Sequence, residues 1–461
     1  MENFWDYSVW GTFNLIAVLL LSLLVGYVLK RSLRFLQASL VPASVLGGLI
    51  LLIVAGIYHL TSGTVLFDTP FFGNSGTNRL EIITYHTLAL GFIATALKSV
   101  GSHLSKKRFT EIFNTGVTTV STYILQGIFG LGITILTALI LPGFFPASGL
   151  LLPFGYGQGT GQALNYGNIY ENFFGFYGGK SFGLTIAAIG FLSACIGGVI
   201  YLNILKRKGK IKILVGEEKA LRSEEIQGNN EVPMQESMDK ITIQIAFAAG
   251  SYFITYLLMT LLGNLLPGLR SVIFGFNFLL GVLIASLVKF LLRKLRERHV
   301  IKKEYLNNFL LTRISNFFFD LMVVAGIAAI RLNVLKNFWP VLLVLCAVGL
   351  VVTFLYNHFV AFRLFQNYKH EQFLMMYGML TGTASTGIIL LREIDPSFST
   401  PASENMVYQN FPAIVFGFPM MFLAAFAPKN PLLTLSILLA FFLVMNLILF
   451  RSRIFRKKVK E

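Results

Sequence analysis

The chain is dominated by a series of long apolar runs, each close to the length that a helix needs to cross a bilayer. A helix spans the hydrocarbon core with about 20 apolar residues, and its backbone polar groups are all paired within the segment. The runs therefore predict an all-α polytopic membrane protein of the cell membrane. The candidate spans are 10–29, 41–60, 82–99, 114–142, 181–204, 241–263, 268–291, 312–330, 338–362, 409–427 and 431–450.

The basic residues lie mainly in short stretches between these runs. The chain has 38 Lys and Arg against 21 Asp and Glu, a formal net charge of +17, although only 13% of its residues are charged. In a soluble protein this excess would suggest nucleic acid as a partner. Basic clusters that flank apolar runs instead follow the positive-inside rule. We expect a lipid bilayer as the partner and no nucleic acid.

Two glycine-rich segments, 148–172 and 373–392, are apolar enough to enter the membrane but are interrupted by polar residues. Both contain Gly-x-x-x-Gly-Thr, over 155–160 in the first segment and 378–383 in the second. A single motif of this kind more often indicates close helix packing. Paired Gly-interrupted segments at corresponding points of two halves are typical of a transporter's binding site. The matched pair favours a transport site.

The charge distribution also predicts the topology. With the N-terminus outside and the C-terminus cytoplasmic, the basic stretches all lie in the cytoplasm if each motif segment leaves the membrane on the side where it entered. We therefore predict two inverted-topology repeats of about five transmembrane helices, each with a re-entrant or broken-helix hairpin, plus one extra C-terminal helix. The expected parts are 1–204 as first repeat, 205–240 as cytoplasmic linker, 241–430 as second repeat, and 431–461 as extra helix and basic tail.

The polar residues of the two motif segments suit a cation bound by oxygen. Glycines permit backbone conformations that direct carbonyls inward, and half-helix N-termini offer N–H groups to a carboxylate. Neither tip carries an acidic residue, which favours Na⁺ over a proton relay; individual Na⁺ ligands stay unassigned, and no other cofactor is expected. The candidate substrate- and ion-binding residues are Gly155, Gly157, Gln158, Gly159, Thr160, Gly161, Gln162, Gly378, Thr381, Gly382, Thr383, Ser385, Thr386 and Gly387.

Two charged residues are further candidates for coupling or substrate binding. Asp320 is the only acidic residue deep inside a predicted span. A charge at that depth is costly and is a functional hypothesis by default, with a protonated or hydrogen-bonded structural Asp as the alternative. Arg392 and Glu393 close the second motif segment. Such a pair usually anchors a helix at the interface, but Arg392 would meet an anionic substrate if the hairpin brings it inward.

Three stretches together resemble a known family: Pro42–Gly48, which reads Pro-x-x-x-x-Gly-Gly, and the motifs Gly155–Gly161 and Gly378–Gly387. Up to about residue 428, the chain is similar to the glutamate:sodium symporter family. The resemblance implies inverted five-helix repeats, homodimerisation, and Na⁺-driven uptake of glutamate or a similar dicarboxylic amino acid. It also implies that Na⁺ and substrate bind where the motifs meet, in a transport domain that moves like an elevator against a dimerising scaffold.

The chain departs from this family at three places. Family members typically have His where Gln158 stands, and a Thr-Pro-Thr element where this chain has Thr381-Gly382-Thr383. The final span, 431–450, is additional. These differences leave the architecture and Na⁺ coupling in place and bear mainly on whether glutamate is the substrate.

The sequence thus predicts a sodium-coupled symporter for glutamate or a related small anionic solute. Two alternatives stay open. One is a channel or facilitator built from two opposed half-helix hairpins, and the other is a proton-coupled carboxylate carrier. An enzyme is not expected, because the sequence has no Gly-x-Ser-x-Gly nucleophile elbow and no His-Glu-x-x-His metal site.

Overall fold

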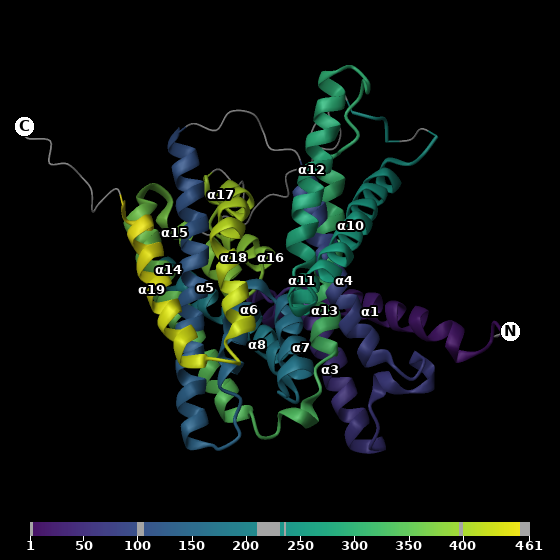
Figure 1. The fold of residues 1–461 in the computed structure, drawn as a ribbon, viewed down its shortest axis with the longest axis vertical. Helices are drawn as coiled ribbons and strands as arrows, with labels where there is room; N and C mark the ends of the chain where they lie inside the picture. The colour runs from purple at the N-terminus through teal and green to yellow at the C-terminus, as the bar shows by residue number, and fades with distance from the viewer. Residues whose placement is uncertain (1–2, 99–105, 210–230, 235–236, 396–399, 452–461) are drawn as a thin grey trace, which may run out of the picture. The chain divides into compact units, whose positions relative to one another are not determined.

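A computed structural model describes residues 3–98, 106–209, 231–234, 237–395 and 400–451 (Figure 1). Over these residues the fold is helical and contains no β-strand, as predicted. Nine helices of the described chain are long and apolar enough to cross a membrane. They are α1 (Tyr7–Ser32), α3 (Ala43–Ser62), α4 (Gly76–Leu97), α5 (Lys106–Ile140), α8 (Gly179–Arg207), α10 (Lys240–Leu265), α13 (Asn308–Ala328), α14 (Trp339–Leu364) and α19 (Pro431–Leu449).

The prediction of one continuous span over 268–291 is wrong. A short helix α11 (Arg270–Gly275) ends before Phe276, and α12 (Asn277–Glu297) begins after it. The side chain of Asn277 explains the break, because its Oδ1 accepts a hydrogen bond from the Phe278 N–H at 2.7 Å. An Asn that bonds its neighbouring backbone in this way competes with helix continuation.

The predicted span 409–427 is also more complicated than expected. It corresponds to α18 (Asn410–Phe426), which follows directly on α17 (Ala402–Tyr408). The segments Ala402–Tyr408 and Pro412–Phe426 meet at an angle of 51°. Pro412 has no backbone N–H to donate, so a bend in the chain at this point has an evident cause.

The chain divides into two compact units. The first comprises residues 1–20, 67–103 and 217–325, and the second comprises 21–66, 104–216 and 326–461. Each unit takes helices from both halves of the sequence. Most of the predicted linker 205–240 lies outside the described residues.

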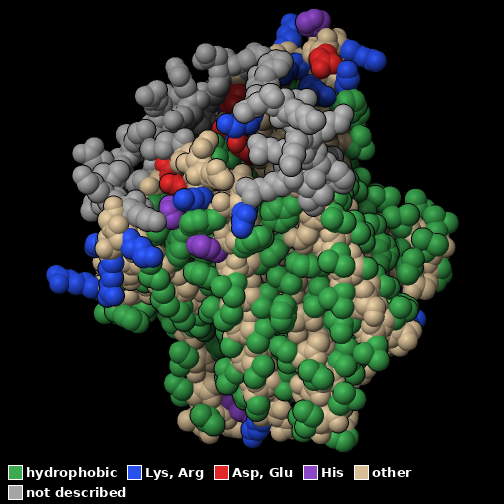
Figure 2. Space-filling view, turned by 90° about the vertical axis from the view of Figure 1, so that its left-hand side faces the viewer, with side chains coloured by type: hydrophobic (Ala, Val, Ile, Leu, Met, Phe, Trp, Pro, Cys, Tyr) green, Lys and Arg blue, Asp and Glu red, His purple; other side chains and the backbone are tan. Residues whose placement is uncertain are grey.

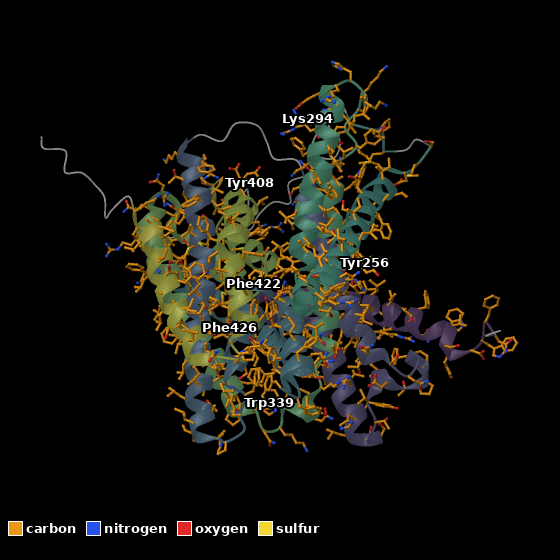
Figure 3. All side chains as sticks on the ribbon, in the orientation of Figure 1. Tyr256, Lys294, Trp339, Tyr408, Phe422 and Phe426 are labelled. Carbon is orange, nitrogen blue, oxygen red and sulfur yellow. The ribbon has the colours of Figure 1, made fainter. Side chains whose placement is uncertain are left out.

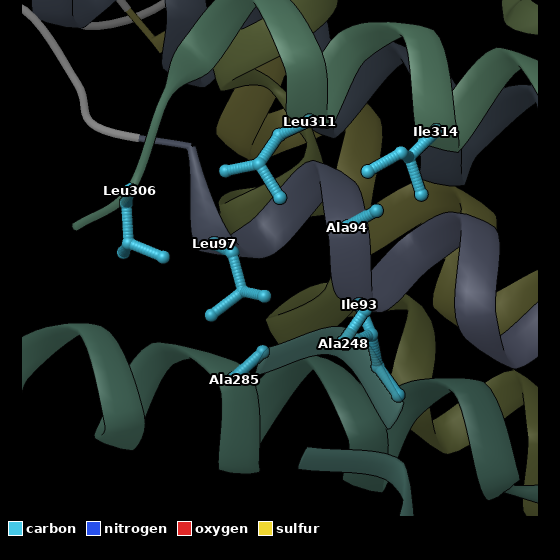
Figure 4. Close-up of a cluster of buried hydrophobic side chains, with 8 residues drawn as sticks. All are labelled: Ile93, Ala94, Leu97, Ala248, Ala285, Leu306, Leu311 and Ile314. Carbon is cyan, nitrogen blue, oxygen red and sulfur yellow. The ribbon is translucent and has the colours of Figure 1, made fainter. Parts of the chain in front are cut away.

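The first unit is held together by an apolar core between α4, α10, α12 and α13 (Figure 4). Ile93 and Leu97 of α4 and Leu311 of α13 are fully buried in it. The facing positions on α10 and α12 are Ala248 and Ala285, whose small side chains permit close helix packing.

The second unit is built around α5, a helix of 35 residues, with α14 and α19 lying along it (Figure 1). Helices α5 and α14 are antiparallel, because Phe144, just after α5, has its ring 6.1 Å from that of Phe338, just before α14. Two pairs of short helices complete this unit beside α8. The first pair is α6 (Leu151–Gln158) and α7 (Thr160–Phe174), and the second pair is α15 (Lys369–Thr381) and α16 (Ala384–Arg392).

The surface has the character expected of a membrane protein. On the face drawn in Figure 2, hydrophobic side chains cover most of the described surface, and most of the charged side chains in view gather in its upper part. Trp339 begins α14 and is 36% exposed, as an aromatic residue at a membrane interface would be (Figure 3). Such a surface requires a lipid environment.

Candidate functional site

The first motif forms the junction between α6 and α7. Gly159 occupies this junction with φ +79° and ψ −168°, a conformation that L side chains rarely adopt. The two helices then fold back on each other, because the rings of Phe154 and Tyr166 stack with their centroids 3.9 Å apart. A continuous helix would separate these two residues by about 18 Å.

The outer ends of this first pair also lie next to each other. Phe145 precedes the pair and Phe176 follows it, and their rings stack with centroids 4.8 Å apart. The chain therefore leaves the pair close to the point where it entered.

The second motif forms a similar junction between α15 and α16. Glycines allow these helices to approach closely: a Cβ on Gly378 would lie 2.8 Å from the Cα of Gly387, and a Cβ on Gly387 would lie 2.5 Å from the carbonyl oxygen of Met375. Real Cβ atoms do not approach other atoms so closely. The backbone contact is therefore available only because both positions are glycine.

Two side chains of α5 bind the two motifs at nearly the same position along this helix. The Tyr123 hydroxyl donates to the carbonyl oxygen of Gly157 at 2.9 Å, and Gln126 Nε2 donates to the carbonyl oxygen of Leu380 at 2.9 Å. Residues three apart share one face of a helix, so both bonds come from the same side of α5. Gly157 and Leu380 belong to the last turns of α6 and α15. The C-terminal ends of these two short helices are thus fixed to the middle of α5.

The two pairs approach this position from opposite ends of α5. At the outer end of the first pair, the Gly149 N–H donates to Thr134 Oγ1 at 3.2 Å. At the outer end of the second pair, Gln372 Nε2 donates to Thr115 Oγ1 at 3.1 Å. Thr115 precedes Tyr123 on α5, and Thr134 follows Gln126. The outer ends of the two pairs therefore lie toward opposite ends of α5, and their junctions meet between these outer ends.

Helix α8 passes beside both motifs. A Cβ on Gly190 would lie 2.5 Å from the carbonyl oxygen of Thr381 and 2.9 Å from Cδ1 of Tyr156. The Tyr156 hydroxyl donates to the carbonyl oxygen of Cys346 on α14 at 2.7 Å and lies 2.9 Å from Ser193 Oγ. Helices α8 and α14 thus hold the first motif while α8 also touches the second.

Residues 10–387 match the model of the sodium/glutamate symporter family. The match covers most of the chain and includes both motifs. The chain therefore belongs to the sodium/glutamate symporter family. Membership implies a multi-pass, non-enzymatic carrier for a glutamate-related solute, with Na⁺ as the coupling ion. A comparison with curated proteins gave no match.

The matched region ends at Gly387, within α16. Helices α17, α18 and α19 therefore lie beyond the part of the chain that resembles this symporter family. The extra helix α19 nevertheless packs along α5, and its Asn446 Oδ1 accepts from the Tyr356 hydroxyl of α14 at 2.9 Å. The second unit of this symporter thus includes an element outside the family match.

The candidate polar residues of this symporter differ in burial. Thr160, Gln162, Thr381 and Thr386 are buried. The Thr381 hydroxyl donates to the carbonyl of Tyr377, one turn earlier in its own helix. By contrast Gln158 and Thr383 are half-buried, and Thr383 Oγ1 is 3.5 Å from Thr386 Oγ1. The side chain of Ser385 lies outside the described part of the structure. The candidate glycines of both motifs lie in or beside the two helix junctions.

Gln162 stands out among these residues. It lies in the first turn of α7 and is 1% exposed, yet neither Oε1 nor Nε2 has a hydrogen-bond partner in the described structure. A buried polar group without a partner is costly, and buried polar groups in native proteins are normally satisfied. The Gln162 amide can therefore still donate and accept hydrogen bonds.

Neither charged candidate lies at a helix junction. Asp320 belongs to the other compact unit, and Arg392 lies at the far end of α16. Asp320 is an exposed residue of α13 in the first compact unit. Arg392 is the exposed last residue of α16, roughly 12 Å along the helix from its first residue. An interfacial role fits this position of Arg392 better than contact with a solute at the tip.

Four further residues that contact the motifs or their partners lie outside both motifs: Tyr123, Gln126, Ser193 and Thr353. Tyr156 lies within the first motif but was not among the candidate residues. A signal for some of them exists in the sequence. Between Thr115 and Gln126, α5 carries several buried Thr and Ser side chains in an otherwise apolar span. Polar residues inside a membrane span are functional hypotheses by default.

Proposed function

We propose that this protein is a sodium-coupled symporter for glutamate or a related small anionic solute, bound where the two helix junctions meet. The observation that carries the proposal is the pair of bonds from Tyr123 and Gln126 to the two motifs. These bonds bring two interrupted helix pairs from opposite ends of α5 to one place. Interrupted helices with facing ends are the usual frame of substrate and ion sites in secondary transporters.

An anionic solute fits the N-terminal ends of α7 and α16. The first N–H groups of a helix have no partner within that helix, and the helix dipole adds positive character there. Among the residues of the two pairs, the basic ones are Lys369, His370 and Arg392, and all three stand at outer ends. Backbone N–H groups and the free amide of Gln162 would therefore bind the carboxylate.

Replacing Gln162 by leucine is expected to weaken glutamate transport by about 10–100-fold in KM, because a hydrogen-bonding group of the site is lost. The glutamate concentration that gives half-maximal uptake would show this. Asn172→Leu, at the exposed far end of the same helix, should leave KM unchanged. An unchanged KM in Gln162→Leu would remove Gln162 from the solute site.

We further propose that both helix pairs are re-entrant and that the two halves are inverted repeats, in a homodimer with an outside N-terminus and a cytoplasmic C-terminus. Two observations support this proposal. The outer ends of the first pair lie next to each other, and the outer ends of the two pairs lie toward opposite ends of α5. An elevator-like movement of the second unit would be compatible with such a frame.

Single-cysteine labelling tests this topology after Cys195 and Cys346 have been replaced. Cysteines at Leu141 and Tyr177, which flank the first pair, should both react with an impermeant reagent from outside. Cysteines at Asn367 and Ser403, which flank the second pair, should both react from the cytoplasmic side. If the two cysteines that flank either helix pair reacted from opposite sides of the membrane, the re-entrant arrangement would be contradicted.

A further inference from the structure

Two buried amides, on α5 and α14, have their donors bound and their oxygens unpaired. Gln126 Nε2 donates to Thr353 Oγ1 at 2.7 Å and to the carbonyl oxygen of Leu380 at 2.9 Å. Asn357 Nδ2 donates to the carbonyl oxygen of Thr353 at 2.9 Å. Both side chains are fully buried. Gln126 Oε1 and Asn357 Oδ1 have no hydrogen-bond partner within the described structure.

The orientation of these amides is fixed by their partners. If Gln126 were turned over, its oxygen would face the carbonyl oxygen of Leu380, and neither atom could donate. Turning Asn357 over would place its oxygen against the Thr353 carbonyl in the same way. The free atom of each amide is therefore an acceptor. Thr353 and Asn357 lie one helical turn apart, so the amides meet around the same turn of α14.

Three nearby hydroxyl groups already donate their hydrogens to backbone carbonyls, so toward any further group they can act only as acceptors. Thr122 and Thr118, one and two turns before Gln126 on α5, donate their hydroxyl hydrogens to backbone carbonyls four residues earlier. Thr381 does the same within α15. The last carbonyls of α15 lie at the negative end of that helix dipole. The surroundings of the two amide oxygens thus favour a positive charge.

We propose that Gln126 Oε1 and Asn357 Oδ1 are ligands of a Na⁺ ion bound between α5, α14 and the C-terminal end of α15. The proposal rests on the proposed function, in which Na⁺ is the coupling ion. Neutral oxygens suit a monovalent cation, whereas Ca²⁺ and Mg²⁺ are usually bound with carboxylates. The same glutamine reaches Leu380 in the second motif.

This double role of Gln126 provides a physical link between ion and solute. A cation on Oε1 polarises the amide and strengthens the bonds that Nε2 donates, because hydrogen bonds in series reinforce one another. Bound Na⁺ would therefore tighten the bond between α5 and the tip of the second pair. A solute at the junction would then meet a more ordered second motif.

The test is the thermal unfolding midpoint of the purified full-length protein as a function of NaCl, with choline chloride keeping the ionic strength constant. A bound ion stabilises the folded state by RT ln(1 + [Na⁺]/Kd), so the midpoint starts to rise once the Na⁺ concentration approaches Kd. Gln126→Met and Asn357→Leu should each raise the Na⁺ concentration at which the midpoint starts to rise by about 10–100-fold. Asn357→Asp keeps the oxygen and adds charge, so it should lower this concentration.

The control is Gln244→Leu in α10. Gln244 is fully buried, its Nε2 donates to the carbonyl of Tyr305 at 2.8 Å, and its Oε1 accepts from the Asn307 N–H at 3.1 Å. Loss of the Gln244 amide should lower the thermal unfolding midpoint in choline chloride and leave the dependence of this midpoint on Na⁺ unchanged.

Wild-type Na⁺ dependence in both Gln126→Met and Asn357→Leu would overturn the site and indicate that the two oxygens bind water only. If these variants do not fold, an unchanged or weakened Na⁺ response of Asn357→Asp would overturn it instead. A wild-type midpoint that ignores Na⁺, in a protein whose uptake is Na⁺-driven, would remove the site and leave the proposed function standing. Absence of Na⁺-driven uptake would remove the proposed function itself.

Discussion

Replacing Gly190 by valine is expected to reduce Na⁺-driven uptake by more than about 100-fold while the protein still inserts into the membrane. The Cβ of the new side chain would lie 2.5 Å from the carbonyl oxygen of Thr381 and 2.9 Å from the ring of Tyr156. The first of these atoms belongs to the backbone and cannot turn away. The substitution therefore separates the two motifs, and displacements of about 1 Å at a functional site typically cost two orders of magnitude.

Gly132→Val on α5 is the matched control, because a Cβ on Gly132 has nothing within 4 Å. It also lies in the second unit and within a long helix, so it carries the same cost in helix propensity. Uptake should be normalised to the amount of protein in the membrane. Near wild-type uptake in Gly190→Val would show that the close contact of α8 with both motifs does not matter for transport.

Gly157→Ala is expected to abolish transport, and removal of a neighbouring ring should partly restore it. A Cβ on Gly157 would lie 2.1 Å from Cε1 and 2.5 Å from Cδ1 of Tyr123, so the ring must leave its position. Overpacking of this kind costs about 1–3 kcal/mol or more. In the double variant Gly157→Ala/Tyr123→Ala the clash is gone, although the hydrogen bond to the Gly157 carbonyl is lost as well.

Uptake and thermal midpoint of the four proteins of this cycle measure the coupling between the two positions. The double variant should be more active and more stable than Gly157→Ala, and no more active than Tyr123→Ala. Additive losses would mean that Tyr123 does not pack on the first motif in the functional protein.

The sequence supports the helical class and most spans because apolar length is a local property. It also indicates both motifs, since Gly159 stands where the backbone adopts positive φ and Gly378 and Gly387 stand where two helices touch. The family membership is likewise confirmed by the match over residues 10–387.

Other features depend on contacts that no local pattern contains. The bonds of Gln126 to Leu380 and of Tyr156 to Cys346 join residues far apart in the sequence, so their partners emerge only in the folded chain. The break before Asn277 was hidden by continuous apolar sequence on both sides. For Arg392, the sequence could not show whether the fold brings its side chain inward to the junction of α15 and α16 or leaves it exposed at the far end of α16.

The most direct test of the central claim is glutamate uptake into proteoliposomes under an inward Na⁺ gradient. The account predicts saturable accumulation above the outside concentration, which disappears when Na⁺ is equal on both sides or replaced by K⁺. Uptake that is indifferent to the Na⁺ gradient would contradict it. Equilibration of glutamate without accumulation would indicate a channel. Accumulation of glutamate driven by a proton gradient alone would indicate a proton-coupled carrier.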